Sequence, residues 1–86
     1  MARVTIHYWA AAKDAAGMAT ESVDADTLAD ALDLARSRHI ENSKFATVLA
    51  RSSFLVDGVQ AGHRAAESVI LRDSAVVEVL PAFAGG

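Results

Sequence analysis

Residues 27–38 read TLADALDLARSR, and this stretch decides the fold class that the sequence predicts. Thr27 is a favourable N-cap residue, and Asp30 follows three positions later, as in a capping box with aspartate in the glutamate position. Arg36 and Arg38 lie in the last turn, where positive side chains suit the helix dipole. The apolar residues that recur at helical spacing are Leu28, Ala31, Leu32 and Ala35. The sequence therefore predicts one principal helix over 27–38.

Strand patterns precede this helix. Residues 3–9 alternate between two faces, which is typical of a half-buried strand. One face carries Val4, Ile6 and Tyr8, and the other carries Arg3, Thr5, His7 and Trp9. An alanine-rich turn of helix follows, and we expect it to end at Gly17 in a left-handed cap. Residues 19–25 then predict a second strand that returns on the first like a hairpin.

Three local signals organise the second half of the chain. Residues 44–51 predict a shorter second helix. The Asp-Gly pair at 57–58 stands between apolar runs and predicts a tight two-residue hairpin. The last strand follows an Asp-Ser turn at 73–74, and we expect it to end at Leu80 or Pro81, because proline cannot donate to a strand ladder.

The resulting element order is β-β-α-β-β-β, with one principal helix. A single helix that covers one face of a mixed sheet of about five strands makes an α+β fold. The first and last strands are expected to be central neighbours, paired in parallel across the long connection between them.

Composition indicates a folded protein with one core. The chain has 86 residues, of which 52% are hydrophobic and 22% charged, and it has no cysteine. The missing cysteine excludes disulfides, thiol nucleophiles and thiolate metal sites. No apolar run approaches the roughly eighteen residues that cross a bilayer, and the N-terminal segment does not resemble a signal peptide. We therefore expect a soluble, cytoplasmic protein that does not act at a membrane.

Charge is distributed unevenly along the chain, whose net charge is −3. Between residues 14 and 35 there are six acidic residues and no lysine or arginine. They are Asp14, Glu21, Asp24, Asp26, Asp30 and Asp33. This run is either an ordinary solvated face or a patch that steers a basic partner. No cluster of basic residues interleaves with aromatic ones, so no nucleic-acid partner is expected.

The usual signatures of enzyme sites are missing from the body of the sequence. None of His7, His39 and His63 has a second histidine or a cysteine three or four positions away, so no metal site is expected. No serine lies in a G-x-S-x-G context, and no glycine-rich loop joins a strand to a helix. We therefore expect no catalytic site and no bound cofactor inside the fold.

The C-terminal segment is unusual. The sequence ends in VVEVLPAFAGG, and at average glycine usage about one chain in two hundred ends in two glycines by chance. A carboxylate on Gly86 is a poor electrophile until it is activated, and an adenylate there would accept sulfur or amine nucleophiles. Gly85 and Gly86 have no Cβ atom and can thread a narrow active site; the alternative is an inert, flexible end. We expect residues 82–86 to form a tail that is poorly ordered without a partner, outside a domain of residues 1–81.

Apolar residues near this tail predict a partner surface. Phe83 lies in the tail between two alanines, and an exposed aromatic residue there suggests a docking anchor. Trp9 falls opposite the core face of the first strand, and Leu80 falls opposite that of the last. We expect them to form a partner surface together with Pro81 and Ala84. The alternative is that each makes a core or edge contact that simple alternation misses.

The ending LPAFAGG, the segment YWAAAKDAAG and the single capped helix resemble the small, sulfur-carrying subunit of molybdopterin synthase over the whole chain. The resemblance implies the ubiquitin-like β-grasp fold. It implies that an ATP-dependent, E1-like activating enzyme adenylates Gly86, that sulfur transfer then gives a thiocarboxylate, and that this chain itself binds no cofactor. The tail would insert into the large subunit of the synthase, where the thiocarboxylate delivers sulfur to a cyclic pyranopterin phosphate.

The resemblance also assigns roles to individual residues. Gly86 becomes the residue that carries the acyl-bound sulfur, and Gly85 is the preceding residue, which has no bulky side chain. Trp9 stands where the family has a partner-facing aromatic residue, and Leu80 takes the apolar position before the proline. Lys13 matches a basic position that faces partners.

Other functions fit the same ending. The terminal Gly-Gly is shared by sulfur carriers for thiamin and cysteine biosynthesis and by ubiquitin-like modifiers that form isopeptide bonds to lysine. A plain binding module with an inert tail is a further alternative. Residues 36–53 and 60–68 match the family pattern loosely, so partner contacts in those segments are not assigned.

Overall fold

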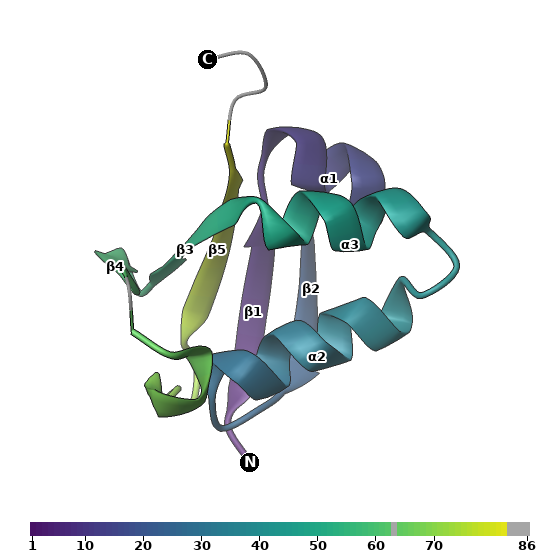
Figure 1. Cartoon of the computed structure of the whole chain (residues 1–86). Coiled ribbons are helices and arrows are strands. Elements are labelled where there is room, and N and C mark those ends of the chain that lie inside the picture. Colours follow the sequence, from purple (N-terminus) through teal and green to yellow (C-terminus); the bar gives the residue numbers. More distant parts are fainter. Residues whose placement is uncertain (63, 83–86) are drawn as a thin grey trace.

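The predicted mixed sheet is present, and helices cover one of its faces (Figure 1). The computed structural model describes residues 1–62 and 64–82. The elements in chain order are β1 Arg3–Tyr8, α1 Ala10–Ala16, β2 Thr20–Asp24, α2 Leu28–Arg38, α3 Ser43–Ala50, β3 Ser52–Val56, β4 Val59–Gln60, a 3₁₀ turn at Ala66–Ser68 and β5 Val76–Pro81. Over these described ranges no helix has the length and apolarity of a membrane span; the longest, α2, has 11 residues.

The two ends of the chain form the centre of the sheet. The strand order is β2-β1-β5-β3-β4, and β1 pairs with β5 in parallel, with Ile6 opposite Val77 and Tyr8 opposite Val79. The other neighbouring pairs are antiparallel. The predicted central parallel pair is thus confirmed, and the α+β class with it.

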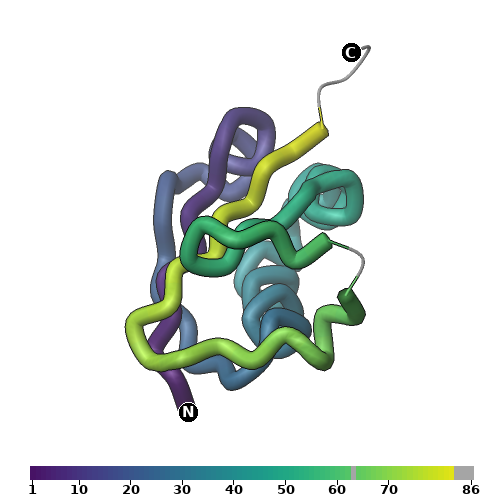
Figure 2. The backbone as a smooth tube through the Cα atoms, turned by 90° about the vertical axis from the view of Figure 1, so that its left-hand side faces the viewer, coloured from purple at the N-terminus to yellow at the C-terminus, as the bar shows by residue number. Residues whose placement is uncertain are grey.

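The helix layer closes the core as the sequence predicts, with one addition. The Thr27 side chain accepts a hydrogen bond from the Asp30 N–H at 3.1 Å, which confirms the N-cap. The face of α2 that is buried consists of Leu28, Ala31, Leu32 and Ala35. The shorter helix α3 also contributes to the core, through Phe45 and Leu49. Figure 2 shows α2 and α3 on the same side of the sheet.

The turns have the backbone geometry that their residues favour. Gly17 ends α1 with φ of 75°, the left-handed cap that the sequence predicts. Asp57 and Gly58 both have positive φ, 50° and 84°, as in the type I′ turns that join two-residue hairpins. At the predicted 73–74 turn, the Asp73 carboxylate accepts the N–H of Arg3 at 2.8 Å and ties the turn to the start of β1.

The last strand ends at Pro81, as predicted. Ala82, the first residue of the predicted tail, is exposed, and its N–H donates to the carbonyl of Arg51 at 3.2 Å. Backbone bonding to the segment before β3 therefore extends one residue beyond the proline. Residues 83–86 lie outside the described residues, and the prediction for that part of the tail stays a prediction.

Candidate functional site

The face of the sheet opposite the helices carries a partly exposed group of side chains near the end of β5. We call His7, Trp9, Leu55, Glu78 and Leu80 the sheet-face patch. In the strand register, Glu78 lies beside His7 on one side and opposite Leu55 on the other. Trp9 follows β1 directly, and Leu80 is next to last in β5. The patch therefore lies where the chain leaves the sheet toward residues 83–86.

Trp9 is held in one orientation. Its ring stacks on His7, with centroids 4.2 Å apart and planes 26° from parallel, and its indole Nε1–H donates to Glu78 Oε1 at 3.1 Å. The backbone N–H of Trp9 donates to the Val79 carbonyl at 3.2 Å, while the Trp9 carbonyl accepts from Ala12 at 2.9 Å. Trp9 as a whole residue nevertheless stays 42% exposed. Strand alternation thus placed Trp9 correctly, outside the core.

The other predicted interface residues in the described ranges are also accessible. Leu80 and Pro81 are partly exposed, and Lys13 is exposed on α1. Figure 1 shows α1 at the end of the sheet where β5 ends, so Lys13 and the sheet-face patch belong to the same end of the molecule. Phe83, Ala84, Gly85 and Gly86 lie outside the described residues. The partner roles of all these residues remain predictions.

The structure reveals a largely buried polar pair that the sequence pattern did not predict. His39 Nε2 lies 2.6 Å from Glu21 Oε2, and their side chains are only 11% and 7% exposed. Arg38 Nη1 lies 3.4 Å from the other oxygen of Glu21 and donates to the carbonyl of Ser22 at 2.6 Å. The pair joins the end of α2 to strand β2. Strand alternation could have predicted that Glu21 is buried. Glu21 stands two residues before buried Val23 and therefore lies on the same face of β2.

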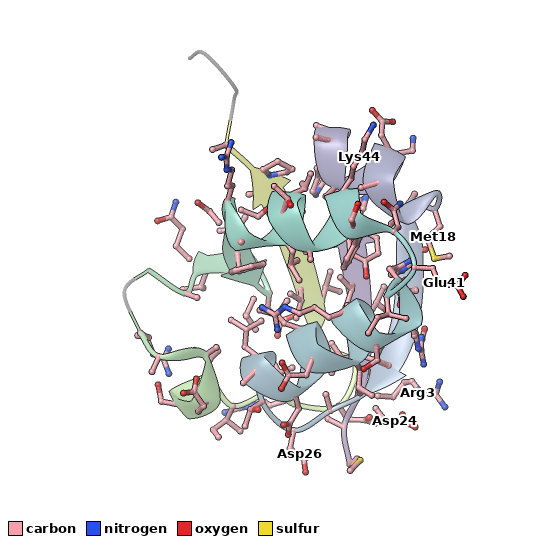
Figure 3. All side chains as sticks on the ribbon, turned by 45° about the vertical axis from the view of Figure 1, so that its right-hand side comes forward. Arg3, Met18, Asp24, Asp26, Glu41 and Lys44 are labelled. Atoms are coloured by element: carbon pink, nitrogen blue, oxygen red, sulfur yellow. The ribbon has the colours of Figure 1, made fainter. Side chains whose placement is uncertain are left out.

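Several members of the acidic run between residues 14 and 35 have local partners, while Asp24, Asp30 and Asp33 line one surface hollow together. Asp24 pairs with Arg3 at 3.0 Å, and Figure 3 shows the two side chains together beside the start of β1. Asp33 pairs with Arg36 at 2.8 Å on α2. Asp26 accepts the backbone N–H of Ala2, and Glu21 is buried with His39. Local contacts therefore account for Asp24, Asp33, Asp26 and Glu21, and a steering role for the run stays a prediction.

Tyr8, the last residue of β1, is fully buried in the core. Its ring packs against that of Phe45, with centroids 5.5 Å apart. Its hydroxyl has no hydrogen-bond partner within residues 1–62 and 64–82. Burial raises the pKa of Tyr8 well above its ordinary value, and the negative charge of Glu21 raises it further. A buried phenol of this kind stays neutral, so it supports packing rather than acid–base chemistry.

This raised pKa predicts a loss of stability in alkali. Above pH ~10 the unfolded chain loses the phenol proton while the folded protein keeps it, so each further pH unit should cost up to about 1.4 kcal/mol of unfolding free energy. Below that pH the two states hold the same proton and the contribution does not change. Tyr8 is the sole tyrosine, so tyrosinate absorbance reports on it directly.

The measurement is a paired titration of tyrosinate absorbance and circular dichroism. We expect tyrosinate to form only as the fold is lost, and Tyr8→Phe to remove this component of the pH dependence. Tyrosinate formation near pH ~10 in a protein that is still folded would contradict the assignment.

The described histidines each contact another side chain. Across residues 1–62 and 64–82, no group of three or more His, Asp or Glu side chains is arranged to hold a metal ion. His7 stacks on Trp9 and His39 pairs with Glu21, while His63 lies outside the described residues.

Comparisons with known proteins bear on the family and the fold. The model of the ThiS family matches residues 6–86. Small archaeal modifier protein 1 from Methanosarcina acetivorans is 20% identical, with a TM-score of 0.84 over 100% of this chain and 98% of that one. A putative molybdopterin converting factor subunit 1 from Pyrococcus furiosus is also 20% identical, with a TM-score of 0.77 over 96% and 100%.

A third similar structure contains a partner. It is the complex of subunits 1 and 2 of the molybdopterin-converting factor from Helicobacter pylori 26695, 17% identical, with a TM-score of 0.67 over 98% of this chain and 99% of that one. A comparison with curated proteins finds no match.

The low identities mean that these structures establish the fold alone, which is the predicted ubiquitin-like β-grasp. The family match is more informative, because it covers nearly the whole sequence and includes both Gly85 and Gly86. The chain belongs to the ThiS family, whose model covers it from Ile6 to Gly86.

Proposed function

We propose that this protein carries sulfur as a thiocarboxylate on Gly86 and donates it in molybdopterin biosynthesis, as the small subunit of a two-subunit synthase. One observation carries the proposal: the family match extends through the Gly-Gly pair, which follows closely on a central strand that ends at Pro81. Two of the similar structures named above are molybdopterin converting factor subunits, and this pathway is the one proposed for the chain.

The chemistry of the carrier is set by the carboxylate. An ionised carboxylate resists nucleophilic attack, so an activating enzyme first transfers the adenylyl group of ATP to it and releases pyrophosphate. A sulfur nucleophile then displaces AMP and leaves sulfur on the carbonyl carbon of Gly86. In this proposal ATP belongs to the activating enzyme, and this chain binds no cofactor and performs no catalysis alone. A cytoplasmic location, where ATP is available, is part of the proposal.

The fold suits such a carrier. β5 lies between β1 and β3 at the centre of the sheet; β1 pairs with it as far as Val79 and β3 as far as Pro81, so the strand that precedes the tail is anchored up to its last residue. Gly85 and Gly86 add no side-chain bulk, and the tail can therefore enter a narrow pocket of the large subunit. The sheet-face patch lies near the end of β5, just before the tail begins. It can therefore contact the large subunit that receives the tail.

A protein modifier is the second candidate. Of the three similar structures named above, the one with the highest TM-score is a small archaeal modifier protein. The same adenylate on Gly86 would then be attacked by a lysine amine of a target instead of a sulfur nucleophile. Carriers for thiamin or cysteine biosynthesis use the same first step.

The test is reconstitution with ATP, a sulfur donor and candidate adenylating enzymes from the same cell, followed by intact-mass measurement. We expect the mass to rise by the difference between sulfur and oxygen. Addition of a large subunit and the pterin precursor should then form the dithiolene. Mass gain without dithiolene assigns the carrier to another pathway, and isopeptide-linked products assign it to protein modification.

Replacing the exposed anchors is expected to weaken partner binding without loss of fold. Trp9→Ala and Leu80→Ala should each weaken binding to the activating enzyme or large subunit by about 1–3 kcal/mol, as for interface hot spots. Their melting temperatures should change little, because both side chains lie outside the core. The matched control is Ile40→Ala, an exposed residue between α2 and α3. A large fall in stability with intact binding would show that the face is assigned wrongly.

A further inference from the structure

Glu78 is a carboxylate set among apolar neighbours in the sheet-face patch. Its register neighbours are His7 across the parallel pair and Leu55 across the antiparallel pair. Its neighbours along the same face of β5 are Val76 and Leu80, two residues away in each direction. Glu78 itself is partly buried by them. A charged group therefore stands in the middle of a surface that is otherwise suited to apolar docking.

One oxygen of this carboxylate is already used. Glu78 Oε1 accepts the indole N–H of Trp9 at 3.1 Å. Within the described ranges, 1–62 and 64–82, no hydrogen bond or ion pair to Glu78 Oε2 is present. A partner that covers the patch removes water from this second oxygen. Burying an ionised carboxylate without a new partner is strongly unfavourable, so the docking surface must supply a donor, preferably a positive one.

Trp9 adds a second recognition element beside the first. His7 covers one face of the indole, yet 42% of Trp9 stays exposed. A guanidinium can stack on an aromatic ring and donate to a carboxylate with the same planar group, which an ammonium does less well. The indole bond to Glu78 keeps the ring and the carboxylate next to each other before any partner arrives.

We propose that Glu78 is a specificity-determining residue of this surface: with Trp9 it forms a receptor for an arginine side chain presented by the enzyme that docks on the sheet face. The identity of the docking enzyme rests on the proposed function. The preference for arginine rests only on the arrangement of Trp9 and Glu78. Glu78 selects for a basic residue at the centre of the partner surface, and it orients Trp9 through the indole N–H.

The first experiment uses the isolated full chain and a small probe. Trp9 is the sole tryptophan, so one indole N–H signal in a ¹⁵N correlation spectrum reports on it. N-acetyl-arginine amide should shift this signal in the natural protein, and the uncharged N-acetyl-citrulline amide should not. Glu78→Gln should abolish the arginine response, and Glu78→Leu should also speed exchange of the indole proton severalfold. Glu41→Gln, the same charge change in the exposed loop between α2 and α3, is the matched control.

The second experiment uses the adenylating enzyme or large subunit that is active in reconstitution. Glu78→Gln should weaken its binding about ten- to a hundredfold and reduce the salt dependence of the dissociation constant, while Glu41→Gln changes neither. Equal affinities for Glu78→Gln and the natural protein, or tighter binding by Glu78→Leu, would overturn the proposal. So would a probe response that does not depend on Glu78.

The carrier function and the arginine receptor can fail separately. If no enzyme adds sulfur to Gly86 but the arginine probe still requires Glu78, the proposed function is wrong and the arginine receptor stands. If sulfur is added normally and Glu78→Gln leaves partner affinity and the probe response unchanged, the receptor is wrong and the carrier function stands.

Discussion

Appending one alanine after Gly86, or deleting Gly86, is expected to abolish thiocarboxylate formation completely. In the proposed mechanism the adenylating step needs a carboxylate at the end of two glycines, and either change moves that carboxylate or puts a Cβ beside it. The fold should be unaffected, because β5 ends at Pro81 and the core lies within the described residues before it. Intact mass after reconstitution and melting temperature are the two measurements.

The matched control is one alanine added before Met1, which is 92% exposed. That variant should gain sulfur like the natural protein. If the variant extended after Gly86 still supports cofactor synthesis, Gly86 is not the chemical end of the molecule and the carrier mechanism is wrong.

Phe45→Ala is expected to destabilise the fold more than any of the other substitutions proposed for this protein, by about 3–5 kcal/mol. Phe45 is 1% exposed and meets the rings of Tyr8 and His39, with centroids 5.5 Å and 4.5 Å away. Removing the ring leaves a cavity between α3 and the sheet and loosens the packing around the Glu21–His39 pair. For a domain of this size the melting temperature should fall by at least about 12 °C.

Urea unfolding followed by circular dichroism tests this expectation. Ile40→Ala is the control, since that side chain is 79% exposed and its removal should cost less than about 0.5 kcal/mol. A loss below about 1 kcal/mol for Phe45→Ala would mean that α3 is not part of the cooperative core.

Local signals explain why much of the fold was predictable. The α2 helix follows from its apolar spacing and from the Thr27 cap, whose bond to Asp30 is present as expected. The hairpin at Asp57 follows from an Asp-Gly pair that tolerates positive φ at both positions. Trp9 is exposed because alternation in β1 continues to the residue after the strand. Each of these features depends on neighbours within a few residues.

Long-range contacts explain what was missed. The small helix α3 was predicted, but its role in the core was not, because that role depends on Tyr8 and His39 from distant parts of the chain. The acidic run fitted either a solvated face or a steering patch, and its pattern did not predict that folding pairs Asp24 with Arg3 and buries Glu21 against His39. The order of charged residues along the chain does not predict which basic side chain each acidic side chain will pair with.

By itself, the sequence determined the α+β class, the principal helix, the tight turns and the glycine-rich ending, because backbone preferences and apolar periodicity are local properties. Only the tertiary structure decided the surroundings of the ionisable side chains. It placed Glu78 between His7 and Leu55 in the strand register. There Glu78 Oε1 accepts a hydrogen bond from the indole N–H of Trp9, although the two residues are 69 positions apart in the chain. The reason is physical: the parallel pairing of β1 with β5 was predicted, but the register that sets Glu78 beside His7 and the hydrogen bond from the Trp9 indole join residues far apart in the chain, and no local preference encodes those contacts.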